Sequence, residues 1–161
     1  MRKGMFAIGA LIFIFAFSEM VFAEDFQVGY INIASVFKDY KKVEDSNKSL
    51  EESKEQVKKM VSVLRGLQEN YEQLSDEAKA KKKKEITSKQ EEIQKRTLVI
   101  RKDEDRVLRE LLQDIENVGK TLRKNKKLTY ILDDRIVIAG PKEMDLTKEL
   151  VGLLNERYKG K

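Results

Sequence analysis

The side chains that most often carry out enzyme chemistry are scarce in this sequence. It contains no His and no Cys, which removes histidine bases, thiol nucleophiles and Cys/His zinc sites together. One carboxylate pair, Asp133-Asp134, invites a catalytic assignment, but adjacent side chains in a strand turn diverge, and Asp is common in turns because it bonds to nearby backbone. The acidic run 103–105 lacks the alternating oxygen ligands and the glycine of a calcium loop. We therefore predict that the protein is not an enzyme and has no catalytic, metal or cofactor-binding residues.

A concentration of lysines is the second feature with chemical consequences. Residues 76–102 hold ten basic and five acidic side chains, in a chain whose formal net charge is +5. The candidate contacts for an anionic client or surface are Lys79, Lys81, Lys82, Lys83, Lys84 and Lys89. Such a region attracts anionic proteins or lipid headgroups over long range; the alternative is a solvated tip that keeps bare helices soluble. Nucleic acid is not expected as a normal partner, because base-stacking aromatics are missing from this region.

These lysines lie within a long helical segment, residues 41–124. Its first part repeats apolar residues every seventh position, at Val43, Leu50, Val57, Leu64 and Tyr71, as a coiled coil does. The spacing predicts a helix over 41–74, a reversal near 74–80 with Ser75 and Asp76 at the turn, and a return helix over 76–124. Ser75 suits an N-cap, and acids suit the first turn of a helix. One uninterrupted helix with a change of phase is the alternative.

The two ends of the chain predict short strands and short helices. Residues 26–33 are rich in β-branched and aromatic side chains and indicate a buried strand. Asn32, near the end of this segment, is expected to cap a short helix over 34–40. Residues 129–132 and 135–139 indicate two strands joined by a turn at Asp133-Asp134, and Gly140-Pro141 ends the second strand. A final helix over 146–158, capped by Asp145, buries Leu146, Leu150, Val151, Leu153 and Leu154.

The expected fold class is therefore α+β. With 38% charged residues and 161 residues in all, the chain has no room for a large core. Segments 24–40 and 125–161 are expected to form one small β-containing oligomerisation body, with the helical hairpin inserted between them. Short strands with apolar faces need cover from elsewhere, which favours association of copies.

Residues 1–23 have the pattern of a secretory signal. Arg2 and Lys3 precede the apolar run 4–17, and Val21-Phe22-Ala23 fits a signal peptidase site, so we expect cleavage after Ala23. An uncleaved anchor is the alternative, although the apolar run is short for a bilayer span of about 20 residues. Without cysteine the mature chain cannot be a lipoprotein.

The order of these features resembles the Skp (OmpH-like) family of periplasmic chaperones. The resemblance is carried by the signal, the segment 28–37, the long charged hairpin, and the ending 130–147 with its terminal helix; the hairpin alone would match many coiled coils. It implies a homotrimer whose strands form a β-barrel-like body, with helical arms enclosing a cavity that holds unfolded outer-membrane proteins without ATP. Carried over by position, the body residues are Val28, Tyr30, Ile31, Ile136 and Ile138, and the lysines at 79–84 belong to the arm tips.

The sequence leaves two functional classes open. The preferred one is a trimeric periplasmic holdase chaperone, with unfolded outer-membrane β-barrel proteins and further copies of itself as partners. The alternative is a structural coiled-coil envelope protein that contacts anionic lipid or a folded partner; anionic lipid or lipopolysaccharide could also contact the holdase. Nothing in the residues identifies the clients or the side chains that face them.

Overall fold

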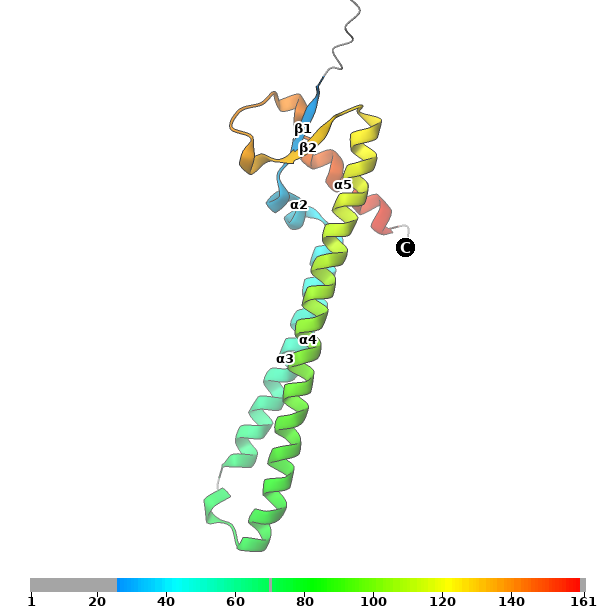
Figure 1. The fold of residues 1–161 in the computed structure, drawn as a ribbon. Helices are drawn as coiled ribbons and strands as arrows, with labels where there is room; N and C mark the ends of the chain where they lie inside the picture. Colours follow the sequence, from blue (N-terminus) through cyan, green and yellow to red (C-terminus); the bar gives the residue numbers. More distant parts are fainter. Residues whose placement is uncertain (1–25, 70, 160–161) are drawn as a thin grey trace, which may run out of the picture.

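A computed structural model describes residues 26–69 and 71–159. It consists of a long two-helix arm with a small body at one end, and both ends of the described chain lie in that body (Figure 1). The predicted signal, residues 1–23, lies outside the described residues. The expected fold class is confirmed: a small sheet built from both chain ends carries a long, inserted helical hairpin.

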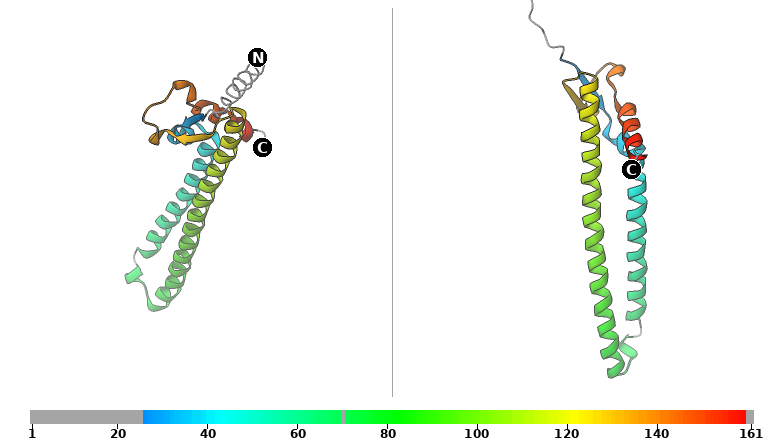
Figure 2. Two further views of the ribbon diagram at one scale, coloured as in Figure 1. Left: turned by 45° about the horizontal axis from the view of Figure 1, so that its top comes forward. Right: turned by 90° about the vertical axis from the view of Figure 1, so that its right-hand side faces the viewer.

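The arm consists of two antiparallel helices, α3 (Lys41–Gln68, 28 residues) and α4 (Asp76–Asn125, 50 residues). They run side by side in every view (Figure 2). At 1.5 Å per residue α4 is about 75 Å long. The single uninterrupted helix is thereby excluded, but α3 ends at Gln68 and not at residue 74. A short 3₁₀ turn, η1 (Tyr71–Gln73), lies between the two helices.

The two helices of the arm follow different repeats. On α3 the half-buried positions alternate three and four residues apart, the heptad spacing predicted from the sequence: Val43, Ser46, Leu50, Ser53, Val57, Met60, Leu64 and Leu67. On α4 a series of half-buried and buried positions steps mostly by four, four and three: Ala78, Lys82, Ile86, Lys89, Ile93, Thr97, Ile100, Glu104, Val107, Leu111, Ile115, Val118 and Leu122. That eleven-residue repeat favours a straight or slightly right-handed path. Four residues of α4 lie seven apart but belong to this eleven-residue repeat and not to a heptad repeat: Ile86, Ile93, Ile100 and Val107.

The sheet consists of two parallel strands, β1 (Val28–Ile31) and β2 (Tyr130–Asp133). Val28 pairs with Tyr130 and Ile31 with Asp133. Parallel strands need a long crossover, and here the crossover is the whole arm. Gly29 lies where the sheet meets the C-terminal segment: a Cβ there would be 2.6 Å from Leu146 Cδ1.

The predicted hairpin at Asp133-Asp134 and the predicted strand over 135–139 are wrong. Within the described residues β2 has no antiparallel partner, because the chain turns into a 3₁₀ helix, η2 (Asp134–Ile136), directly after the strand. The Asp133 carboxylate accepts a hydrogen bond from the Arg135 backbone N–H at 3.0 Å and so stabilises the turn. Another 3₁₀ segment, η3 (Lys142–Met144), follows Pro141.

The two short helices of the body begin where side chains cap them. Asn32 accepts a hydrogen bond from the Ser35 N–H at 2.6 Å, as predicted, so that β1 ends before it and α2 (Ile33–Asp39) begins after it. The helix α5 (Thr147–Lys159) follows Asp145, whose carboxylate accepts from the Thr147 N–H at 3.0 Å. A side-chain cap satisfies one of the free N–H groups at a helix start.

The hydrophobic core lies where α5, α2 and the base of α4 meet. Its most fully buried side chains are Val36, Leu122, Leu150 and Leu154. The buried side chains of α4 are Leu111, Ile115, Val118 and Leu122, all in its last third, and α3 has none. The core therefore anchors the base of the arm, and beyond it α3 and α4 cover one another only partly.

Candidate functional site

The six candidate lysines differ in exposure and in ion pairing. Lys81, Lys83 and Lys84 are exposed, and none of them makes an ion pair with a described residue. Lys82 and Lys89 belong to the half-buried series of α4, and Lys89 Nζ lies 2.8 Å from Glu92 Oε2. The ammonium group of Lys79 lies 3.8 Å from a carboxylate oxygen of Glu72 in the turn. Among the six candidates, the lysines without an ion pair to a described residue are therefore Lys81, Lys82, Lys83 and Lys84, and of these four only Lys82 is half-buried.

The turn residues lie where the chain enters α4. Ser75 is at the N-cap position with extended backbone, but its hydroxyl makes no capping hydrogen bond, so the expected side-chain cap is wrong. The Ser75 carbonyl accepts from the Lys79 N–H at 2.8 Å. Asp76 and Glu77 lie in the first turn of α4, where the helix dipole favours negative charge.

The five candidate body residues divide into two sets. Ile31 is buried within the chain itself. The other four, Val28, Tyr30, Ile136 and Ile138, line one open hollow of about 590 Å³ beside the η2–η3 loop. Ile136 is 67% exposed and Ile138 is fully exposed, although both are large apolar side chains.

Two exposed aromatic residues near the sheet were missed by the sequence reasoning. Phe26 and Tyr130 are 69% and 54% exposed, and their ring centroids lie 5.8 Å apart. Tyr130 also lines a second hollow, of about 630 Å³, between the sheet and the base of α4. The alternation of residues 129–132 was a usable signal, because it places Tyr130 and Leu132 on one face of the strand and Ile131 on the other.

An apolar groove at the base of the arm was also missed. It has a volume of about 690 Å³ and lies where α2, α3 and α4 meet, with Phe37, Leu50 and Leu108 among the lining residues and the ion pair of Lys54 and Glu104 at its edge. The sequence predicted that the apolar last third of α4 packs on the core, yet Leu108 and Leu112 are 49% and 47% exposed. The adjacent pairs 107–108 and 111–112 were the signal, because one helix face cannot bury both members of each pair.

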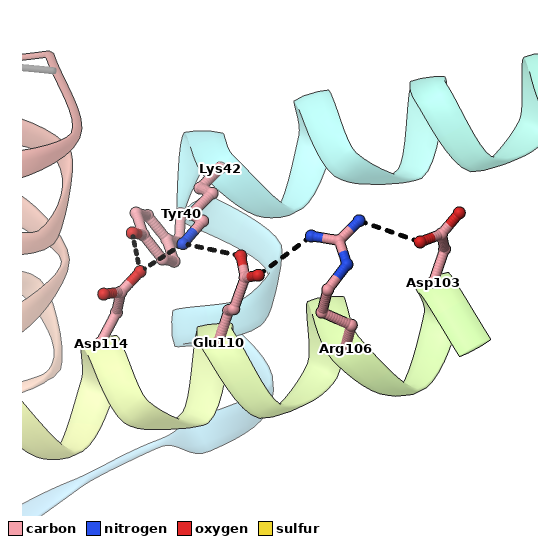
Figure 3. Close-up of polar contacts among 6 residues, drawn as sticks. All are labelled: Tyr40, Lys42, Asp103, Arg106, Glu110 and Asp114. Carbon is pink, nitrogen blue, oxygen red and sulfur yellow. Dashed lines mark hydrogen bonds and ion pairs between the residues drawn. The ribbon is translucent and has the colours of Figure 1, made fainter. Parts of the chain in front are cut away.

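A row of charged residues joins α3 to α4 at the base of the arm (Figure 3). Lys42 Nζ lies 2.7 Å from Asp114 Oδ2 and 3.6 Å from Glu110 Oε2, and the Tyr40 hydroxyl donates to Asp114 at 3.1 Å. Along α4, Arg106 bonds both Glu110 and Asp103, each at 3.0 Å. Burial, followed by the neighbouring Asp114 carboxylate, raises the pKa of Tyr40, so the phenol stays protonated and donates at neutral pH.

Carboxylates are frequent within residues 26–69 and 71–159, the part of the chain that the structure describes. No cluster of ligands able to hold a metal ion occurs there. Asp133 receives hydrogen bonds from the Arg135 guanidinium and backbone, which lower the pKa of Asp133 to about 2. Asp134 accepts a hydrogen bond from the Asn32 amide at 2.6 Å. Asp133 is therefore ionised at neutral pH.

Comparisons with known proteins give the chain a family. A family model described as outer membrane protein (OmpH-like) matches residues 27–154. One similar solved structure is a candidate outer membrane chaperone (OmpH-like) from Caulobacter crescentus, 14% identical, with 81% of this chain and 84% of that chain covered and a TM-score of 0.47; this likeness carries no argument by itself. The comparison with curated proteins found no match. Within 26–69 and 71–159, no helix is long and apolar enough to cross a membrane. Because the family model covers most of its length, the chain belongs to the OmpH-like outer membrane protein family.

Proposed function

We propose that the protein is an ATP-independent periplasmic holdase, which binds unfolded outer-membrane β-barrel proteins between its helical arms and prevents their aggregation. The OmpH-like family suggests an outer membrane chaperone and is not a family of enzymes. The holding activity, the unfolded clients and the enclosing cavity are the parts that this proposal adds.

The observation that carries the proposal is the apolar groove at the base of the arm. Leu108, which lines the groove, is 49% exposed, and Leu112, one turn further along α4, is 47% exposed. An open, shallow apolar groove can receive short apolar stretches of many different unfolded chains, because it sets no demanding shape. Individual contacts of this kind are weak, and many together retain a chain that can later be released.

The lysines at the tip extend the proposal to charge. Lys81, Lys83 and Lys84 carry charges that no ion pair within the described residues neutralises. We expect them to steer anionic segments of a client toward the arms, more strongly at low salt than at high salt. Anionic lipid or lipopolysaccharide would compete for the same charges.

Assembly into a homotrimer is the third part of the proposal. The sheet has two strands, too few to be stable alone, and four large apolar side chains around it are exposed: Phe26, Tyr130, Ile136 and Ile138. Copies of the chain that share this surface would extend the sheet into a β-barrel-like body and place their arms around a common space. Export to the periplasm rests on the pattern of residues 1–23 and agrees with the family.

The test of function is an aggregation assay with residues 24–161. An outer-membrane β-barrel protein unfolded in urea is diluted into buffer with the purified protein, and turbidity is followed over time. We expect suppression that saturates at a fixed ratio of chaperone oligomer to client. Replacing Leu108 and Leu112 with Ser should weaken suppression at all salt concentrations, and replacing Lys81, Lys83 and Lys84 with Gln should weaken it mainly at low salt.

The matched control for the lysine variant removes the same charge from the body end of the molecule. Lys41, Lys124 and Lys148 are exposed and lie far along the chain from the tip, and replacing them with Gln should leave suppression near the original level. Absence of suppression by the unaltered protein at every salt concentration would contradict the holdase. A stable complex with a folded envelope partner, together with indifference to unfolded clients, would support the structural coiled-coil alternative.

A further inference from the structure

The first turn of α3 begins at a sharp corner in the chain. Tyr40, between α2 and α3, has extended backbone angles (φ −82°, ψ 113°) and is only 3% exposed. The helical path is therefore broken there, and α3 leaves the body in a new direction. Whatever holds this corner decides where α3 lies against α4.

Two side chains from the corner reach across to one carboxylate of α4. The Tyr40 hydroxyl donates to Asp114 Oδ2 at 3.1 Å, and the Lys42 ammonium lies 2.7 Å from the same oxygen. The side chains of Lys42 and Asp114 are 18% and 17% exposed, which makes theirs the most sheltered of the ion pairs between α3 and α4 in the described residues. A sheltered ion pair is screened less by salt than a surface pair and is costly to break one side at a time.

The helix α5 holds the same corner from the other side. The Asn155 amide accepts from the Lys41 backbone N–H at 2.9 Å and donates to the Asp39 carbonyl at 3.1 Å. One side chain thus satisfies a free N–H at the start of α3 and a free carbonyl at the end of α2, groups that a helix break leaves without partners. The Tyr158 ring lies edge-on to Tyr40, with centroids 6.2 Å apart.

Apolar packing does little to fix the position of α3 against α4. None of its side chains is buried, and two positions of its heptad series, Ser46 and Ser53, are small and polar. The interface between α3 and α4 can therefore shift or separate at a small cost in free energy, because each apolar side chain of α3 is only partly buried. Polar contacts that fit in one register only are the device that helical pairs use to specify alignment.

We propose that Tyr40, Lys42, Asp114 and Asn155 form a clamp that fixes the register and separation of α3 on α4 at the base of the arm. When these contacts are formed, α3 and α4 can separate at the tip of the arm, where few apolar side chains lie between them. Their alignment at the base of the arm is then maintained. These four are positioning residues, and their importance for holding a client rests on the proposed function. The clamp itself is a statement about the arm without a client.

The experiment compares two matched pairs of substitutions. The clamp variant combines Lys42→Met with Asp114→Asn, which removes both charges while the asparagine oxygen still accepts from Tyr40. Glu110 keeps its partner, because Arg106 also bonds it. The control combines Lys54→Met with Glu104→Gln, an ion pair of the same 2.7 Å length between the same helices, but more exposed and far from the corner.

Hydrogen exchange measures whether α3 opens at its base. In the clamp variant, amides of residues 41–53 should exchange about tenfold faster, the effect of losing a charge-assisted contact. The control should change them by less than about threefold, as for an exposed ion pair. Exchange in α5 is the check for global destabilisation, because a general loss of stability would speed exchange there as well. We expect the exchange rates of α5 to stay unchanged in both variants.

Distances between spin labels provide the second readout. The chain contains no cysteine, so Lys48→Cys and Arg109→Cys, both at exposed positions of the arm base, can be labelled cleanly. Labelled chain is diluted into unlabelled chain so that each oligomer carries one pair. The clamp variant should broaden and lengthen the distance distribution, and the control should leave it unchanged. Should the clamp variant fail to fold, Asn155→Ala removes the α5 side of the clamp and should give the same broadening.

The outcomes separate the clamp from the proposed function. Unchanged exchange in 41–53 together with an unchanged label distribution, in the clamp variant or in Asn155→Ala, would overturn the clamp. Loosening of α3 in a protein that does not suppress client aggregation would leave the clamp standing and refute the holdase. Loosening accompanied by weaker suppression would support both.

Discussion

At the scale of single residues, adjacent carboxylates turn out to have separate structural tasks. Asp133 bonds the backbone and the guanidinium of Arg135, while Asp134 accepts from the Asn32 amide. The pair therefore ends β2 and connects the two ends of the chain, which gives both acids of this short loop a structural role.

A titration tests the bond between Asp133 and Arg135. The ordinary pKa of 3.8 falls to about 2 because the guanidinium and backbone N–H groups stabilise the carboxylate. The stabilisation linked to this group is therefore present above about pH 4 and is lost as the pH falls through about 2. In Arg135→Ala, we expect the carboxyl carbon resonance of Asp133 to titrate closer to 3.8. Lys142→Ala is the control, and an unchanged low pKa in Arg135→Ala would contradict the assignment.

At the scale of elements, the two helices of the arm have unequal roles. The base of α4 supplies Leu111, Ile115, Val118 and Leu122 to the core, whereas α3 supplies no buried side chain. Polar residues also interrupt the α4 series at Lys82, Lys89, Thr97 and Glu104. We infer that α4 is the structural axis of the molecule and that α3 depends on it, so local opening should begin in α3 near the tip.

Leucine truncations measure this inequality. Leu122→Ala removes a side chain that is 1% exposed and should lower the free energy of unfolding by about 2–5 kcal/mol, because it leaves a cavity in the core. Leu64→Ala, at a half-buried position of α3, should cost about 1 kcal/mol. Urea unfolding followed by circular dichroism at one protein concentration provides the comparison. Equal losses at the two sites would mean that the arm is as tightly packed as the body.

At the scale of the whole molecule, the body looks incomplete as a single chain. Its two-stranded sheet leaves one edge of β2 without a neighbour among the described residues, and an unpaired edge invites pairing with another chain. Exposed Ile136 and Ile138 border the same region. These features support the proposed oligomer, in which surfaces that are costly to expose are covered by other copies.

A charged substitution tests where the copies meet. Ile138→Asp places a carboxylate in the proposed interface and should shift the protein from oligomer toward monomer, because burying an unpaired charge is strongly unfavourable. Leu98→Asp is the control: Leu98 is 56% exposed but lies on the arm. Light scattering after size-exclusion chromatography reports the mass of each variant. An unaltered protein that is already monomeric, or an oligomer that survives Ile138→Asp, would remove this interface from the proposal.

Sequence alone determined the features that depend on local patterns. The heptads of α3, the Asn32 cap and the buried face of α5 follow from periodicity and capping within short windows, and those signals do not depend on the rest of the fold. The antiparallel arm was predicted from the change of heptad phase and from the need for the two flanking segments to meet. Only the tertiary structure decided that β1 and β2 run parallel, that residues 135–139 form no strand, and that Lys42 and Tyr40 meet Asp114. A strand forms only where a partner is present, and an ion pair between distant residues requires the fold that brings them together. Val137 and Ile138 read as strand by composition, yet within one chain no described segment lies beside them to pair with.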